Sequence, residues 1–140
     1  MSVTSIYRDE HAALGALIKE FEVLLEVNKV PAQAAECRKV LSNLAGKLRI
    51  HLATEDKLLY PRAAQSTDQS IRDLAARFQQ DMGPLAQTFK AYSDRWLLPK
   101  DIASQAATFV TESRKVIQAL TDRIRRENTE FYVALDKAGP

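Results

Sequence analysis

The sequence lacks several features that mark whole classes of protein. It has a single cysteine, Cys37, so no disulfide can form within the chain, and a reducing compartment is expected. No stretch approaches the roughly 18 apolar residues that a membrane-spanning helix needs, and the N-terminus has no apolar core of a signal peptide. We therefore expect a cytoplasmic protein with no membrane association. Cys37 falls on an apolar helix face, which predicts a buried, inert thiol.

Charge of one sign and turn-forming residues are also scarce. The net charge is only +2, with 20 basic and 18 acidic residues interleaved. The densest basic cluster, Arg123, Arg125 and Arg126, is interrupted by Ile124 and followed by Glu127, so nucleic-acid binding is not expected. Four glycines and five prolines leave room for few turns in 140 residues. The length and the 46% hydrophobic content predict a single domain over residues 1–140.

Four long amphipathic segments fill the chain. They are expected to run from about Thr4 to Val27, Pro31 to Tyr60 or a little beyond, Ser66 or Thr67 to Trp96, and Asp101 to Asp136. Ser2 or Thr4 can cap the first helix, Ser66 or Thr67 the third, and Pro61 should end or kink the second. Gly83-Pro84 should bend or split the third. Short connections between such helices predict an all-α fold, an antiparallel up-down-up-down four-helix bundle.

Two polar residues interrupt the apolar face of the second helix. The face steps by three or four residues through Cys37, Leu41, Leu44, Leu48, His51, Glu55 and Leu58. His51 and Glu55 are one helical turn apart and point the same way. A histidine and a glutamate inside a core are unfavourable unless a partner satisfies them, and a metal ion would do so.

Further polar residues should lie at the same level of the bundle. His11 begins the apolar face of the first helix, and Glu127 lies on the apolar face of the fourth. Arg123 lies on a neighbouring row, and the pattern leaves open how far it turns inward. Two imidazoles and two carboxylates suit a divalent first-row metal, iron first, with manganese or zinc as alternatives. Tyr60 fits a core or a surface patch, and the sequence leaves the exposure of Tyr7 and Tyr132 open.

At this point the chain resembles the haemerythrin-like (HHE cation-binding) domains. The resemblance covers nearly the whole length and includes a histidine near the start of helix one. It also includes His51-xxx-Glu55 followed by Leu-Leu-Tyr60-Pro61 late in helix two. The resemblance implies a four-helix bundle with a carboxylate-bridged di-iron centre. It further implies oxygen binding, oxygen or iron sensing, or redox and nitric-oxide responses.

Two expected ligands are replaced. The family's helix-three histidine falls here at Met82, beside Asp81, and its helix-four histidine falls at Arg123, while Glu127 is retained. In the family, the histidines of helices one and two bind one iron, and those of helices three and four bind the other. What the resemblance leaves is a candidate half-site of His11, His51, Glu55 and Glu127.

The replacements lead to a specific hypothesis. Arg123 supplies positive charge where the second iron would be and pairs with Glu55 or Glu127. Met82 is expected to pack, because a thioether is a poor ligand for hard iron. Asp81 would reach inward only if Pro84 distorted the third helix. The site would then hold one iron per chain or none, with the metal-free form slightly favoured.

Two functions remain open on this basis. The first is a sensory, regulatory or interaction module with little or no metal, acting on a protein partner or as a homodimer. The alternative is a mononuclear iron (or other divalent metal) protein that responds to oxygen, nitric oxide or iron, with the small ligand binding only when metal is present. An enzyme has little support, since no nucleophile–base pair or phosphate loop is visible. A histidine phosphotransfer bundle is disfavoured because both histidines are expected to face inward.

Overall fold

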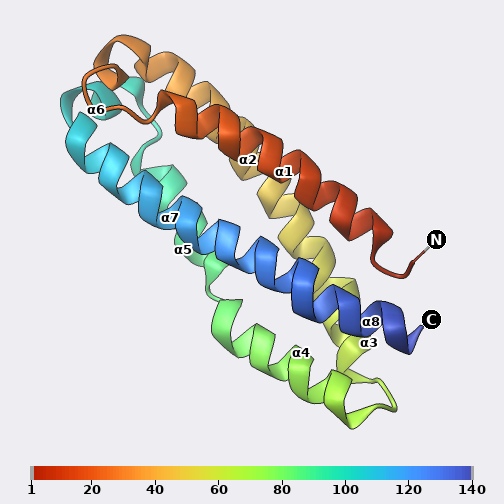
Figure 1. Cartoon of the computed structure of the whole chain (residues 1–140). Coiled ribbons are helices and arrows are strands. Elements are labelled where there is room, and N and C mark those ends of the chain that lie inside the picture. Colours follow the sequence, from red (N-terminus) through yellow and green to blue (C-terminus); the bar gives the residue numbers. More distant parts are fainter. Residues whose placement is uncertain (1, 140) are drawn as a thin grey trace.

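The computed structural model describes residues 2–139, which form an all-helical bundle with no strand in that range (Figure 1). Helix α1 spans Ser5–Leu24, and a 3-10 turn (η1) at Val30–Gln33 leads into α2, Ala34–Thr54. A π-helical turn (η2) at Glu55–Leu59 continues directly into α3, Tyr60–Ala64. The all-α prediction is confirmed for the described residues.

The second half of the chain also ends in a long α-helix that continues through a π-helical turn into a short α-helix. Helix α4 spans Gln69–Met82, α5 Leu85–Arg95 and α6 Pro99–Ser104. Helix α7 spans Ala106–Arg126, and a second π-helical turn (η3) at Glu127–Phe131 continues into α8, Tyr132–Ala138. Helix α1 packs along α2 and also contacts α7, while α5 packs on both α2 and α7. Both ends of the chain lie at the same end of the molecule (Figure 1).

The ends of α1 differ from the sequence-based prediction. Thr4 occupies the N-cap position, but its hydroxyl donates to the Asp136 carboxylate at 2.8 Å and makes no capping bond. The helix ends at Leu24 and not near Val27, because the backbone leaves helical geometry at Leu25. The Leu25 side chain nevertheless remains in the core.

Two predicted boundaries in the middle of the chain are corrected. Asp68, not Ser66 or Thr67, caps α4, and its carboxylate accepts a bond from the Ser70 amide at 2.9 Å. Pro61 does not end the second helix, because it lies in the first turn of α3, where a missing amide is tolerated.

The break at Gly83-Pro84 splits the third segment into α4 and α5, as predicted. A Cβ atom at position 83 would lie 2.5 Å from the carbonyl oxygen of Gln79, so glycine is needed for this close approach. The fourth segment has an unpredicted break at Gln105, between α6 and α7.

The buried apolar side chains form two clusters. The larger one lies among α1, α2, α5, α6 and α7, and the smaller one joins η2, α3 and α4 to η3 and α8. In α1 the buried His11 comes one turn before Leu14 of the larger cluster. In α2 and α7 the buried His51 and Arg123 come one turn after Leu48 and Leu120 of that cluster. A buried polar layer therefore separates the two clusters.

Among the helices of residues 2–139, none combines the length and apolar character that crossing a bilayer requires.

Candidate metal centre

The π-helical turns set which residues face the site. In each turn the amide five residues on bonds to the carbonyl of the glutamate: Tyr60 to Glu55 and Tyr132 to Glu127. The extra residue in each turn redirects the positions that follow it, so that Tyr60 and Tyr132, five residues after the glutamates, are buried. Within the first turn Leu58 is 62% exposed, and Leu59, four residues after Glu55, is buried at 2%. The prediction that Leu58 continues the buried face is wrong.

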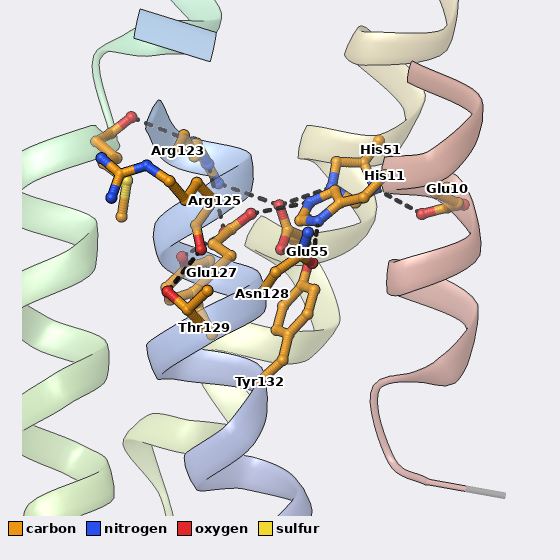
Figure 2. A network of polar contacts seen from close by, with 12 residues as sticks. Glu10, His11, His51, Glu55, Arg123, Arg125, Glu127, Asn128, Thr129 and Tyr132 are labelled. Carbon is orange, nitrogen blue, oxygen red and sulfur yellow. Dashed lines mark hydrogen bonds and ion pairs between the residues drawn. The ribbon is translucent and has the colours of Figure 1, made fainter. Parts of the chain in front are cut away.

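The predicted polar residues converge from four elements (Figure 2). His11 comes from α1, His51 from α2, and the two glutamates from the first positions of the π-helical turns. One ligand atom from each of these four buried residues lies within 4.8 Å of all the others. The four side chains thus form a compact group that could hold a metal ion.

Each histidine faces one carboxylate. The Nε2 atom of His51 lies 3.0 Å from Oε1 of Glu55, and Nε2 of His11 lies 3.1 Å from Oε1 of Glu127. The centre therefore offers two imidazole nitrogens and two carboxylate oxygens.

The outer ring nitrogens are held by acceptor oxygens. Nδ1 of His11 lies 2.8 Å from Oδ1 of Asn128, and Nδ1 of His51 lies 2.6 Å from Oε1 of Glu10. Because these oxygens accept, the Nδ1 atoms carry the ring protons, and the Nε2 lone pairs are left pointing inward. This outer support is the arrangement that commonly orients histidine ligands of metals.

Two buried atoms at the centre have no partner. Among the described residues, neither Nε2 of His51 nor Oε1 of Glu127 has a hydrogen bond of acceptable geometry. A neutral imidazole nitrogen that faces a carboxylate oxygen at 3.0 Å places two acceptors against each other, which is unfavourable without a cation or a proton between them. The donor set therefore fits a metal ion, and a protonated His51 is the metal-free alternative.

Arg123 points into the same layer and is only 4% exposed. Its guanidinium contacts both carboxylates, with NH2 3.3 Å from Oε1 of Glu55 and Nε 3.4 Å from Oε2 of Glu127. NH1 donates to the carbonyl oxygen of Met82 at 3.2 Å. The sequence left open how far Arg123 turns inward, and in the structure its side chain points fully into the core.

The residues beside Arg123 on α4 do not add a donor side chain to the centre. The Met82 side chain is buried in the smaller apolar cluster, and its carbonyl accepts the bond from Arg123. Asp81 points outward and lies 3.4 Å from Arg126. A cavity of about 220 Å³ is lined by Asp81, Met82 and Arg123, among others, at the break between α4 and α5. Another of about 160 Å³ is lined by residues that include Glu10 and His51.

Two tyrosines belong to the site and were missed from the sequence. The hydroxyl of Tyr60 donates to Oε2 of Glu127, and that of Tyr132 donates to Oε2 of Glu55, both at 2.6 Å. Tyr132 also lies 3.2 Å from Nε2 of His11. Both side chains are fully buried. The available signal was a shared spacing, a tyrosine five residues after each glutamate, but α-helical periodicity places that position on another face.

Burial and charge shift the pKa values of these groups in different directions. Burial and the neighbouring Glu127 carboxylate raise the pKa of Glu55 despite the closely facing His51 imidazole. Burial alone would also raise the pKa of Glu127, but the facing His11 imidazole and the charge of Arg123 lower it to about 2. Burial would lower the pKa of His51, yet the carboxylates of Glu55 and Glu10 raise it overall.

The same effects keep the remaining groups in a fixed charge state. Burial and the carboxylates raise the pKa of Tyr60 and Tyr132, so both phenols stay protonated as donors. Burial alone would lower the pKa of Arg123, but the two glutamates raise it. Arg123 is therefore a permanent cation beside the candidate ligands.

Comparison with known proteins gives one match. The profile of the family described as Hemerythrin HHE cation binding domain matches residues 2–135. No curated protein and no solved structure matches the chain.

Proposed function

Since the chain belongs to the hemerythrin HHE cation-binding domain family, we propose that it is a haemerythrin-like domain that binds one iron or other first-row divalent ion per chain. The observation that carries the proposal is the pair of unpartnered buried atoms, Nε2 of His51 and Oε1 of Glu127, inside a group of four potential ligands. Imidazole and carboxylate donors together suit iron, manganese or zinc.

His11, His51, Glu55 and Glu127 would hold the ion. Asn128 and Glu10 would orient the two imidazoles through their Nδ1 atoms. When bound, the ion supplies positive charge and a coordination position for a small ligand such as oxygen or nitric oxide. Such a domain would serve an oxygen, nitric-oxide or iron response, and we expect it in the cytoplasm.

Arg123 would take the place of a second ion. Its guanidinium neutralises Oε1 of Glu55, which also faces His51, and Oε2 of Glu127, and it cannot give up its proton to become a ligand. Binding oxygen as peroxide requires two electrons, which a di-iron centre supplies as one from each iron. A single iron cannot supply both in this way, so reversible oxygen storage is not proposed. We further propose that α1, α2 through α3, α4 with α5, and α7 through α8 form the four legs of an up-down-up-down bundle.

Elemental analysis tests the proposal. The protein is expressed in iron-rich medium and purified without chelator, and metal is counted per chain for the wild type and His51→Ala. We expect one ion per chain in the wild type and none in the variant, with the helical circular-dichroism signal unchanged. Equal metal content in the two proteins would overturn the assignment of the ligands.

A second candidate is a metal-free regulatory or interaction module. It is favoured by one observation, the contact of Arg123 with both carboxylates, because a guanidinium can satisfy buried acids without a metal. In that case no metal is found in either protein. The domain would then act on a protein partner or as a homodimer, and light scattering of the purified chain would test the dimer directly.

A further inference from the structure

The two helices that carry the glutamates repeat one sequence spacing. A basic residue is followed four positions later by a glutamate, and five positions after that by a tyrosine. The first copy is His51, Glu55 and Tyr60 (the histidine arm), and the second is Arg123, Glu127 and Tyr132 (the arginine arm). In both arms a π-helical turn fills the interval from the glutamate to the residue before the tyrosine.

The tyrosine bonds cross between the arms. Tyr60 of the histidine arm donates to Glu127 of the arginine arm, and Tyr132 donates back to Glu55. A π-helical turn within an α-helix is uncommon and tends to occur at functional sites. Here each turn places its glutamate at the centre and its tyrosine against the opposite glutamate. The two arms are therefore tied together reciprocally through four buried side chains.

The crossed bonds also determine which oxygens face the centre. In both glutamates Oε2 accepts from a tyrosine, and Oε1 faces a histidine nitrogen. We propose that Tyr60 and Tyr132 are positioning residues that restrict each glutamate to one ligating oxygen, so that the centre selects a cation of low coordination number. The inference deepens the proposed function, since its coordination part rests on metal binding at this site.

Known coordination preferences indicate which cations such a centre accepts. Two nitrogens and two single oxygens give four donors, which suits zinc or cobalt(II) and leaves open positions for iron. Calcium takes six to eight oxygen ligands and uses carboxylates in a two-oxygen mode, so this arrangement disfavours it. Without the tyrosines, the freed oxygens would allow a higher coordination number.

The two tyrosines should differ in importance. Oε2 of Glu127 also contacts Nε of Arg123 at 3.4 Å, so it retains a partner when Tyr60 is changed. Oε2 of Glu55 has no second partner among the described contacts beyond Tyr132. Removing the Tyr132 hydroxyl should therefore alter the coordination more than removing that of Tyr60.

Cobalt(II) absorption tests the coordination part. Metal-free protein is titrated with cobalt(II) as wild type, Tyr60→Phe, Tyr132→Phe and Tyr92→Phe. Tyr92 is the matched control, because its buried hydroxyl bonds to Ser113 away from the centre. We expect intense four-coordinate absorption for wild type and Tyr92→Phe. Tyr132→Phe should show weaker absorption of higher coordination and roughly 10- to 100-fold weaker binding, and Tyr60→Phe a smaller change. Identical spectra in all four proteins would overturn the inference.

A metal-free measurement tests the crossing itself. Urea unfolding of metal-free protein is followed in double-mutant cycles that combine Tyr132→Phe with Glu55→Gln or with Glu127→Gln. We expect the midpoint shifts to be strongly non-additive with Glu55→Gln and closer to additive with Glu127→Gln, which shares only the contact with His11. The reverse pattern would show that the tyrosines serve their own arms. A wild type that binds no cobalt(II) would overturn the proposed function and the coordination part, while the cycles would still decide the crossed pairing.

Discussion

The histidine arm and the arginine arm share their spacing, their π-helical turn and their buried tyrosine, and they differ in one basic side chain. His51 can lose a proton and offer a lone pair, whereas Arg123 stays charged and only donates. The glutamate of each arm has the same kind of partner whether its arm carries a histidine or an arginine, because it accepts a hydrogen bond from the tyrosine of the other arm. The comparison shows that the same helical frame, with its glutamate, π-helical turn and tyrosine, carries a potential metal ligand in one arm and a fixed cation in the other.

The two glutamates nevertheless have different electrostatic surroundings. The pKa of Glu55 is raised by burial and by the nearby Glu127 carboxylate, whereas that of Glu127 is lowered to about 2 by the facing His11 imidazole and by Arg123. The arginine arm therefore carries the more firmly ionised carboxylate.

Removing the fixed cation should have the largest effect. Arg123→Ala leaves two buried carboxylates without their guanidinium partner, which should lower the free energy of unfolding of metal-free protein by about 3–5 kcal/mol. Urea denaturation measures the change. Arg125→Ala is the matched control, because Arg125 lies one half-turn away, is exposed and forms a surface ion pair with Asp122. A loss of less than about 1 kcal/mol for Arg123→Ala would show that Arg123 does not compensate the carboxylates.

The π-helical turn of the histidine arm can be tested at adjacent leucines. Leu59→Ala removes a buried side chain and should destabilise the fold by about 2–5 kcal/mol, whereas Leu58→Ala should change it by less than about 0.5 kcal/mol. Thermal and urea unfolding of the two variants give the comparison. A larger loss for Leu58→Ala would mean that Leu58, and not Leu59, faces the core.

Acid unfolding should separate the two carboxylates. Glu127 has a folded-state pKa of about 2, below the value of about 4.3 expected for an unfolded chain, so its contribution is present above pH 4.3 and is lost as the pH falls toward 2. The loss is on the order of 2–3 kcal/mol. Glu55 has a raised pKa, so protonating it in acid does not remove stability.

The measurement is urea unfolding at a series of pH values for wild type, Glu127→Gln and Glu55→Gln. Glu127→Gln should flatten the fall in stability below pH 4.3, and Glu55→Gln should retain it. If the two variants have the same acid dependence, the proposed asymmetry of the arms does not exist.

The smallest expected effects concern the residues that orient the imidazoles. Asn128→Ala and Glu10→Ala remove the acceptors of the two Nδ1 protons and should weaken metal binding by roughly 10- to 100-fold each. Competition with a chromophoric chelator measures the affinity. Glu130→Ala, which removes an exposed partner of Arg126, serves as the control. Unchanged affinity in the first two variants would mean that these contacts do not position the ligands.

Much of this centre could be predicted from the sequence, and the reasons for the failures are physical. Helical periodicity brought His11, His51, Glu55 and Glu127 to one level, because each lies on the apolar face of its helix before any π-helical turn has altered the register. It failed at Leu58, within the first turn, and at the two tyrosines directly after the turns. The inserted residue brings the tyrosines inward, and their shared spacing from the glutamates was the available signal for it.

Long-range contacts explain the other misses. The inward orientation of Arg123 depends on carboxylates from two helices and on the Met82 carbonyl, none of which its own helix encodes. The hydroxyl of Thr4 bonds to Asp136 at the far end of the chain, so its failure to cap α1 could not be seen locally. Local propensity is outweighed wherever a distant partner is available.

The most direct test of the account is an iron count per chain in the wild type and in Arg123→His combined with Met82→His, prepared side by side. If Arg123 stands in for a second ion, the wild type should hold one iron. The double variant, which returns a histidine to both replaced positions beside the cavity at the α4–α5 break, should then hold two. A double variant that holds no more iron than the wild type, or a wild type that already holds two, would contradict the account.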